Sequence, residues 1–352
     1  MARMKAVAKT KPAAGFEIIE APVPKLASHE VLVEIKACSI CGSDVHLYQW
    51  DSWAQTNLTP PCIVGHEGAG VVVEAGKQVK HIRVGDRVAL ESHIPCQKCS
   101  LCATGQMHLC RNLQTIGFGR DGCFAEYIAI PEICCVKIGN ETSWELGSIH
   151  EPLGNSVYAV SESDVAGKTV AVFGDGPTGL FAAAVARSKG AARIFAVGAS
   201  PYRMEMMKKL GPDLVVDATK GDVVEILTEK TKGEGVDVVL EMSGDKSAIH
   251  NGFRLVRNGG TFTAFGIPSG PLEIDFAQEI ILKGIKILAI HGRRMFETWK
   301  TMLDLLESGR LDVMSVITHR LPLEQIEQAM QILAKKPATA GKIILVPKNL
   351  SF

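Results

Sequence analysis

Hydrophobic and polar positions follow different spacings in the two halves of the chain. Up to about residue 90, apolar residues come in short runs that alternate with polar ones, as in residues 31–37, and Pro, Gly and Asn interrupt these runs. Alternation with period two over so few residues is typical of strands that bury one face. The first half is therefore predicted to be rich in β-strands.

From residue 167 onward, continuous apolar runs replace the alternating ones. Buried strands are predicted at residues 169–173, 193–197, 214–217, 236–241, 260–265 and 285–291, with helical stretches between them. Strands that alternate with helices in this way are typical of a doubly wound parallel sheet. Two amphipathic helices, 295–308 and 323–335, follow. A closing strand at 342–346 is predicted to rejoin the first lobe.

A chain of 352 residues is long enough for two domains with separate cores. The fold class predicted from these patterns is α/β. We expect a β-rich domain over residues 1–154, an α/β domain over 155–294, and a C-terminal return to the first domain over 295–352.

The charge balance limits the classes of binding partner, and the cysteines indicate the cellular compartment. Basic and acidic side chains number 38 each, so we expect neither nucleic acid nor an anionic membrane as a partner. The first six residues lack an apolar leader, and two lysines interrupt the longest apolar candidate, residues 280–290. A cytoplasmic location is expected, where ten cysteines serve metal or catalytic roles rather than disulfides.

Four cysteines form the most specific motif in the sequence. Cys96, Cys99, Cys102 and Cys110 are separated by two, two and seven residues. Thiolates at such spacings can surround one ion as a closed tetrahedral site, so we predict a structural zinc. The alternatives are two disulfides or four reactive thiols. An iron–sulfur cluster fits less well, because the ferredoxin spacing that ends in proline is absent.

A second candidate metal site combines Cys41 with the neighbouring pair His66 and Glu67. Three protein ligands leave the fourth position of a zinc ion open for water or substrate, as in catalytic sites. Ser43 and His46 follow the cysteine closely and are candidates to accept and pass on a proton. The alternative is that a single cysteine and a His-Glu pair have no metal role, as is common for short motifs.

A glycine-rich turn opens the second half. Gly174, Gly176 and Gly179 have the GxGxxG spacing and lie between a predicted strand and a predicted helix. In that context the glycines give room for a pyrophosphate at the helix N-terminus, so the motif predicts a dinucleotide site.

The sequence indicates less clearly whether the coenzyme is NAD or NADP. An acid that binds the adenosine ribose normally follows the first glycine by about 20 residues, but Gly198 stands there, with Ser200 and Arg203 close behind. A hydroxyl and a guanidinium can hold a 2′-phosphate, which slightly favours NADP over NAD. Alternatively, Ser200 caps the next helix and Arg203 lies near the adenine or a surface carboxylate.

In combination, these motifs resemble the zinc-containing medium-chain dehydrogenases over essentially the whole chain. The resemblance depends on Cys41, the Gly-His-Glu run of 65–67, the four-cysteine loop and the glycine-rich turn. Within that family, the stretches 41–46, 50–55, 151–155 and 291–299 are most similar to L-threonine 3-dehydrogenases. The resemblance implies a GroES-like catalytic domain, a Rossmann cofactor domain and a homotetramer.

The resemblance also implies roles for single residues. The three ligands of the second metal site would hold a catalytic zinc, so that each chain would bind two zinc ions. Ser43 and His46 would relay the proton, and Glu151 would stand beside the metal as an auxiliary acid. Ser43 occupies a position where threonine is usual, which keeps the hydroxyl.

The family's cofactor positions correspond to a further set of residues: Thr178, Gly198, Arg203, Phe265, Gly266, Ile267, Ile290 and His291. Gly198 departs from the family, which carries an acid there and uses NAD.

The reaction implied is oxidation of the secondary hydroxyl of L-threonine to 2-amino-3-oxobutanoate, with hydride passing to NAD(P). One alternative substrate is another secondary alcohol, such as butanediol or a polyol. A different class of protein, a zinc-binding relic without turnover, is disfavoured because the metal and relay residues are all intact.

Overall fold

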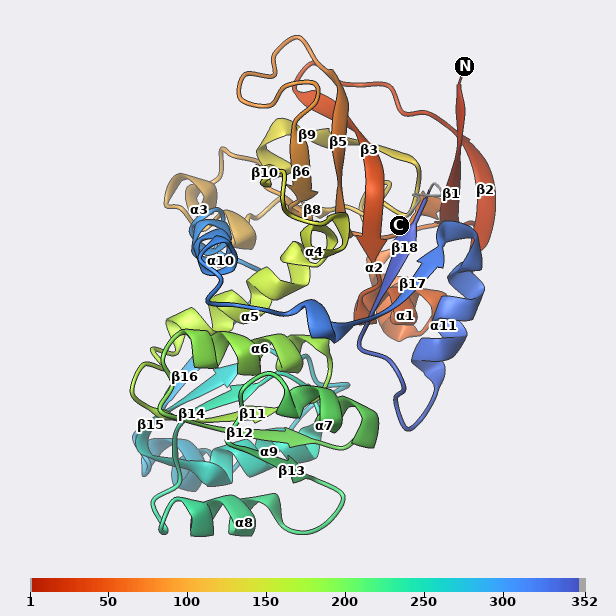
Figure 1. The fold of residues 1–352 in the computed structure, drawn as a ribbon. Coiled ribbons are helices and arrows are strands. Elements are labelled where there is room, and N and C mark those ends of the chain that lie inside the picture. Colours follow the sequence, from red (N-terminus) through yellow and green to blue (C-terminus); the bar gives the residue numbers. More distant parts are fainter. Residues whose placement is uncertain (1, 348–352) are drawn as a thin grey trace. The chain divides into compact units, whose positions relative to one another are not determined.

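The computed structural model describes residues 2–347, which form two compact units (Figure 1). The first unit contains residues 2–152, 317–335 and 342–347, and the second contains residues 153–316 and 336–341. Each unit therefore combines stretches that are far apart in the sequence.

A sheet of seven strands organises the first unit. Its order is β10 (Cys135–Lys137), β6 (Arg87–Leu90), β5 (Glu67–Ala75), β3 (Glu30–Ser39), β18 (Lys342–Val346) and β17 (Ile317–Pro322), and β9 (Tyr127–Pro131) also pairs with β3. The predicted closing strand does rejoin this lobe, since Leu345 lies opposite Cys38.

Smaller elements complete the first unit. One sheet has the order β2 (Glu17–Pro22), β1 (Arg3–Lys9) and β4 (Cys62–Ile63), and a two-stranded sheet joins β7 (His93–Ile94) to β8 (Gln114–Thr115). The helices are α1 (Gly42–Gln49), α2 (Ser52–Asn57), α3 (Ser100–Ala103), α4 (Trp144–Ser148) and α11 (Ile326–Ala334). Short 3₁₀ turns cover Met107–Leu109, Glu132–Cys134 and Leu323–Gln325. Helix α5 (His150–Glu162) begins in this unit and continues into the second.

The second unit is a parallel sheet with helices on both faces (Figure 1). Its order is β13 (Leu214–Asp217), β12 (Arg193–Gly198), β11 (Thr169–Phe173), β14 (Val236–Glu241), β15 (Val256–Ala264) and β16 (Lys286–Ala289). Every pairing in it is parallel, which confirms the doubly wound prediction. The strand order reverses between β11 and β14, and such folds bind ligands at the carboxyl ends of the strands at that point.

The helices of the second unit follow the strands as the sequence pattern indicates. They are α6 (Pro177–Ser188), α7 (Pro201–Lys208), α8 (Val223–Lys230), α9 (Lys246–Leu255) and α10 (Glu297–Glu307), with a π-helical turn at Phe276–Ile281 and a 3₁₀ turn at Met314–Val316. The unit has its own apolar core, in which the rings of Phe253 and Phe262 stack with centroids 4.0 Å apart. Among residues 2–347, none of the helices has the length and apolar character needed to cross a membrane.

Candidate metal centres and cofactor site

The first metal cluster is assembled where two paired strands meet the start of a helix. Cys41 is the N-cap of α1, and the carboxylate of Asp44 accepts the Cys41 N–H at 2.9 Å, which fixes this turn. His66 and Glu67 lie at the start of β5, whose register with β3 places Glu67 opposite Ser39. As a result, the ligand atoms of Cys41, His66 and Glu67 lie within 4.8 Å of one another.

The electrostatics of this cluster fit a divalent cation. Asp44, His66 and Glu67 are buried, and each has one polar atom without a hydrogen-bond partner in the described part of the chain, namely Asp44 Oδ1, His66 Nδ1 and Glu67 Oε1. Burial alone would lower the pKa of His66, but the negative charges of Asp44 and Cys41 outweigh it and raise that pKa to about 10. Sulfur, nitrogen and oxygen donors in one buried, anionic cluster match the ligand preferences of zinc.

Glu67 is held by its second carboxylate oxygen. Ser39 Oγ and Lys342 Nζ both donate to Glu67 Oε2, and Lys342 Nζ also donates to the carbonyl of Ile40 at 2.8 Å. Lys342 is only 2% exposed and Glu67 is fully buried. This buried ion pair fixes the orientation of Glu67, and sequence reasoning missed it because the two residues are 275 positions apart.

Glu151, the proposed auxiliary acid, lies in the first turn of α5 and is 5% exposed. Ser92 Oγ donates to its Oε1 at 2.6 Å. Its charge is one of those that raise the pKa of His66. The structure therefore places Glu151 within electrostatic range of the metal ligands, with Ser92 as a partner that the sequence did not single out.

The two candidate relay residues lie on α1, three positions apart. Residues with this spacing share one face of a helix. Ser43 is half-buried, whereas the side chain of His46 is 54% exposed and its Nδ1 lies 2.5 Å from Asp51 Oδ2. The other oxygen of Asp51 accepts the Ala54 N–H and so caps α2. Asp51 is thus a partner of this candidate relay residue that sequence reasoning did not single out.

Aromatic side chains connect the relay to the metal cluster. The ring of Trp53 lies 5.8 Å from His46 and 5.6 Å from Phe118, and Phe118 in turn lies 5.0 Å from His66. The rings of Trp53 and Phe118 thus form a chain of aromatic contacts from His46 to His66. Phe118 carries no motif, since only the tertiary fold brings it here.

The four cysteines of the second cluster also come together. Cys99 Sγ lies 3.6 Å from Cys102 Sγ and 3.9 Å from Cys110 Sγ, and all four sulfurs lie within 4.8 Å of one another. Backbone N–H groups of Cys102 and Arg111 lower the pKa of Cys99 to about 6. None of the four is in a disulfide. A closed set of four thiols with N–H donors around it fits a structural zinc.

The glycine-rich turn has the geometry expected of a dinucleotide site. Gly174 has φ +113°, and a Cβ there would lie 3.0 Å from Ser243 Cβ. A Cβ on Gly179 would lie 2.0 Å from the Gly174 carbonyl oxygen. Helix α6 starts after Gly176 without a side-chain cap, which leaves its first N–H groups to an anion. Thr178 Oγ1 donates to the Met242 carbonyl at 3.5 Å.

The two side chains considered for a 2′-phosphate have other partners. Ser200 is the N-cap residue of α7, but its Oγ donates to the Ala338 carbonyl at 2.9 Å rather than capping the helix. Arg203 Nε donates to the Ala340 carbonyl at 2.7 Å. Gly198 ends β12, and the carboxylate of Asp175 lies against it.

The remaining candidate cofactor residues follow the ends of β15 and β16, at the same sheet edge as the glycine-rich turn. They are Phe265, Gly266, Ile267, Ile290 and His291. Gly266 is closely packed, since a Cβ there would lie 2.0 Å from the Gly244 nitrogen. Ile290 N–H donates to the Ala264 carbonyl at 2.9 Å, which continues the pairing of the two strands.

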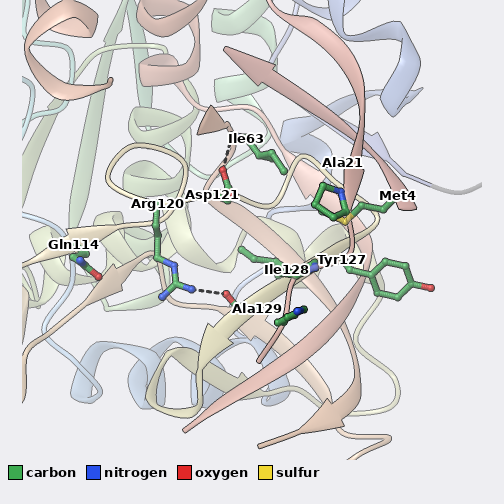
Figure 2. A pocket seen from close by; sticks show the side chains of 13 residues that line it. Met4, Ala21, Ile63, Gln114, Arg120, Asp121, Tyr127, Ile128 and Ala129 are labelled. Atoms are coloured by element: carbon green, nitrogen blue, oxygen red, sulfur yellow. Dashed lines mark hydrogen bonds between the residues drawn. The ribbon is translucent and has the colours of Figure 1, made fainter. Parts of the chain in front are cut away.

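A surface cavity of about 450 Å³ in the first unit lies apart from this chemistry (Figure 2). None of the predicted site residues lines it. Its wall is fixed by hydrogen bonds from Arg120 to the Ala129 carbonyl and from the Ile63 N–H to Asp121. This cavity therefore does not coincide with the candidate site.

Comparison with known proteins identifies the same kind of protein that the two metal clusters and the glycine-rich turn indicate. Two family models match the chain, the alcohol dehydrogenase GroES-like domain over residues 27–140 and the zinc-binding dehydrogenase over residues 177–308. The chain is 42% identical over 346 residues to an L-threonine 3-dehydrogenase of Bacillus velezensis, covering 98% of this chain and 99% of that protein. The L-threonine 3-dehydrogenase of Bacillus subtilis is 41% identical over 345 residues, with the same coverage.

Two solved structures illustrate the likeness of the fold. A zinc-binding dehydrogenase of Sinorhizobium meliloti, solved with NADP bound, has a TM-score of 0.91 at 30% identity and covers 99% of this chain and 100% of its own. The 2R,3R-butanediol dehydrogenase of Bacillus subtilis has a TM-score of 0.87, also at 30% identity, and covers 98% of this chain and 100% of its own.

Proposed function

The chain belongs to the zinc-binding alcohol dehydrogenases, and from that premise we propose that it oxidises the secondary hydroxyl of L-threonine to 2-amino-3-oxobutanoate, with hydride transfer to NAD(P). The observation that supports L-threonine as the substrate is the sequence identity of 40–42%, over nearly the whole chain, to proteins named L-threonine 3-dehydrogenase. The first unit would carry the catalytic residues and the second would bind the dinucleotide.

In this proposal Cys41, His66 and Glu67 hold the catalytic zinc, which when bound acts as a Lewis acid on the substrate hydroxyl. Glu67 is oriented for this role because Lys342 and Ser39 hold its other oxygen. Glu151 lies close enough to the ligands to add negative charge to the cluster. The four-cysteine loop holds a second, structural zinc.

The proton of the substrate hydroxyl leaves through Ser43 and His46. Ser43 lies in the first turn of α1, and His46 lies on the same face with more than half of its side chain exposed. Asp51 holds the His46 ring through Nδ1, so that the other ring nitrogen is free to exchange a proton with the hydroxyl or with water.

The residues at the carboxyl edge of the parallel sheet would hold the dinucleotide, and its nicotinamide would supply the hydride acceptor. Gly174, Gly176 and Gly179 give its pyrophosphate access to the start of α6. Thr178 and the loops after β15 and β16 line the same edge.

The test is the initial rate of reduced-nicotinamide formation with L-threonine, run with NAD and with NADP, and with 2,3-butanediol as the comparison alcohol. We expect the higher kcat/KM for threonine and two zinc ions per chain by metal analysis. Butanediol is the relevant comparison because a butanediol dehydrogenase has the same fold at 30% identity.

Two results would contradict the proposal in different ways. Turnover of the diol without turnover of threonine would retain the zinc mechanism and exclude the substrate. A single zinc ion per chain and no turnover of either alcohol would indicate a protein that has lost its catalytic metal.

We also propose that the enzyme is a homotetramer, as the family resemblance implies. Edge strand β16 and the neighbouring turn would supply one surface for self-association. Four exposed apolar side chains lie on or next to them, namely Phe276, Ile281, Leu282 and Ile287. An apolar edge strand of this kind is normally covered. Light scattering should give the mass of four chains, and Ile287→Lys should reduce it; a monomeric mass for the unaltered protein would refute the proposal.

A cytoplasmic location is a further part of the proposal. None of the ten cysteines, which lie within residues 2–347, is in a disulfide. Ten cysteines used as metal ligands or reduced thiols fit a reducing compartment. Recovery of the protein from an oxidising compartment on cell fractionation would contradict this.

A further inference from the structure

The end of β12 holds a carboxylate that does not come from β12. Dinucleotide folds ordinarily place an acid there to bind the adenosine ribose hydroxyls, and this chain has Gly198 instead. The side chain of Asp175, which stands between the first two glycines of the glycine-rich turn, reaches this place. Its Oδ2 accepts the N–H groups of Ala199 at 2.8 Å and Ser200 at 2.6 Å.

The Asp175 carboxylate lies where a side chain at position 198 would have to be. A Cβ at position 198 would lie 2.9 Å from both Cβ and Oδ2 of Asp175, and 2.9 Å from Met204 Cγ. A side chain at 198 and the Asp175 carboxylate therefore exclude each other. Because Gly198 has no side chain, it leaves the space that the Asp175 carboxylate fills.

The same carboxylate occupies the donors that a 2′-phosphate would use. The N–H groups of Ala199 and Ser200 already bind Asp175, while the side chains of Ser200 and Arg203 bind the Ala338 and Ala340 carbonyls. A phosphate dianion at this position would lie against a like charge, and the two backbone N–H groups, the Ser200 hydroxyl and Arg203 Nε are already engaged. A ribose hydroxyl, in contrast, can donate to Asp175 Oδ1.

We propose that Asp175 is the coenzyme-specificity residue of this enzyme, supplying from the glycine-rich turn the carboxylate that binds the ribose of NAD and rejects the 2′-phosphate of NADP. The proposal rests on the proposed function only in that the second unit binds a nicotinamide dinucleotide. It reverses the slight preference for NADP that Gly198 alone indicated.

The experiment measures dissociation constants of NADH and NADPH by fluorescence titration, without any alcohol present. The unaltered protein should bind NADH at least tenfold more tightly than NADPH. Asp175→Asn keeps an oxygen for the two N–H groups but removes the charge, and should reduce that ratio about tenfold, mainly through tighter NADPH binding. Asp175→Gly combined with Gly198→Asp also removes the Asp175 Cβ, returns the acid to the strand and should restore the preference for NADH.

Asp222→Asn is the matched control, because Asp222 also accepts two backbone N–H groups, those of Val224 and Glu225, at the start of a helix of the same unit. It changes the net charge equally and should leave the ratio unchanged. If Asp175→Asn is too unstable to titrate, Asp175→Ser replaces it.

Three outcomes would overturn the proposal: an unaltered protein that binds NADPH as well as NADH, an Asp175→Asn ratio equal to that of the unaltered protein, or an equal shift in Asp222→Asn. The readout separates this inference from the substrate assignment. Selective NADH binding without threonine turnover would keep Asp175 as the specificity residue and refute the substrate, whereas failure to bind either nucleotide would refute both.

Discussion

Replacing Lys342 with methionine is expected to lower the free energy of unfolding by about 3–5 kcal/mol, the usual range when one partner of a buried ion pair is removed. Lys342 is 2% exposed and donates both to Glu67, which has no exposure, and to the Ile40 carbonyl at 2.8 Å. Methionine fills a similar volume but leaves the Glu67 carboxylate without its cation. Urea unfolding of the zinc-loaded and zinc-depleted protein measures the loss, which should be larger without zinc because the metal partly replaces the missing charge.

A double-variant comparison separates the ion pair from simple packing. Lys342→Met combined with Glu67→Gln removes both charges, and in the zinc-depleted protein it should be less destabilised than Lys342→Met alone. Lys5→Met is the exposed control, since the Lys5–Glu324 pair lies at the surface of the same unit and its loss should change stability little. A double variant that is no more stable than the single one would show that the lysine acts through packing rather than charge.

The parts of the site that the sequence predicted are those whose residues are close in the chain. Cys96 to Cys110 lie on one loop, and His66 and Glu67 are neighbours, so spacing alone indicates a ligand set before the fold is known. The structure brings both sets together. The parallel sheet was also predictable, because a fully buried strand has a continuous apolar run.

The parts that the sequence did not predict depend on pairing across long distances. Lys342 reaches Glu67 only because β18 pairs with β3, and Phe118 reaches His66 only through the fold of its loop. Asp175 was visible as an acid inside the glycine-rich motif, but its direction was not. The sequence marked Gly198 as a position without an acid, and only the structure shows that Asp175 takes the space.

Helix faces show the same limit on a smaller scale. In α10 the structure buries Trp299, Met302 and Leu305, whereas Leu303 and Leu306 are only partly buried. These three leucines lie within four positions, so the apolar period alone does not decide which one is covered, and packing against neighbouring elements does.

Replacing His46 with alanine is expected to lower kcat for threonine oxidation by about 100-fold or more at neutral pH, which is the usual contribution of a positioned proton-transfer group. Zinc content should stay at two ions per chain, because His46 belongs to neither cluster of ligand atoms. Part of the lost rate should return at high pH, where hydroxide can take the proton directly. The measurements are the pH dependence of kcat and metal analysis of the same preparation.

Two further variants test whether the effect belongs to the relay. Asp51→Asn keeps the cap of α2 but removes the charge that holds the His46 ring at 2.5 Å, and should give a smaller decrease in kcat with the same pH dependence. His81→Ala replaces an exposed histidine of the same unit and should leave kcat unchanged. If His46→Ala loses zinc along with activity, the ring supports the metal cluster. The loss of rate would then follow from loss of the metal, and the relay would be refuted.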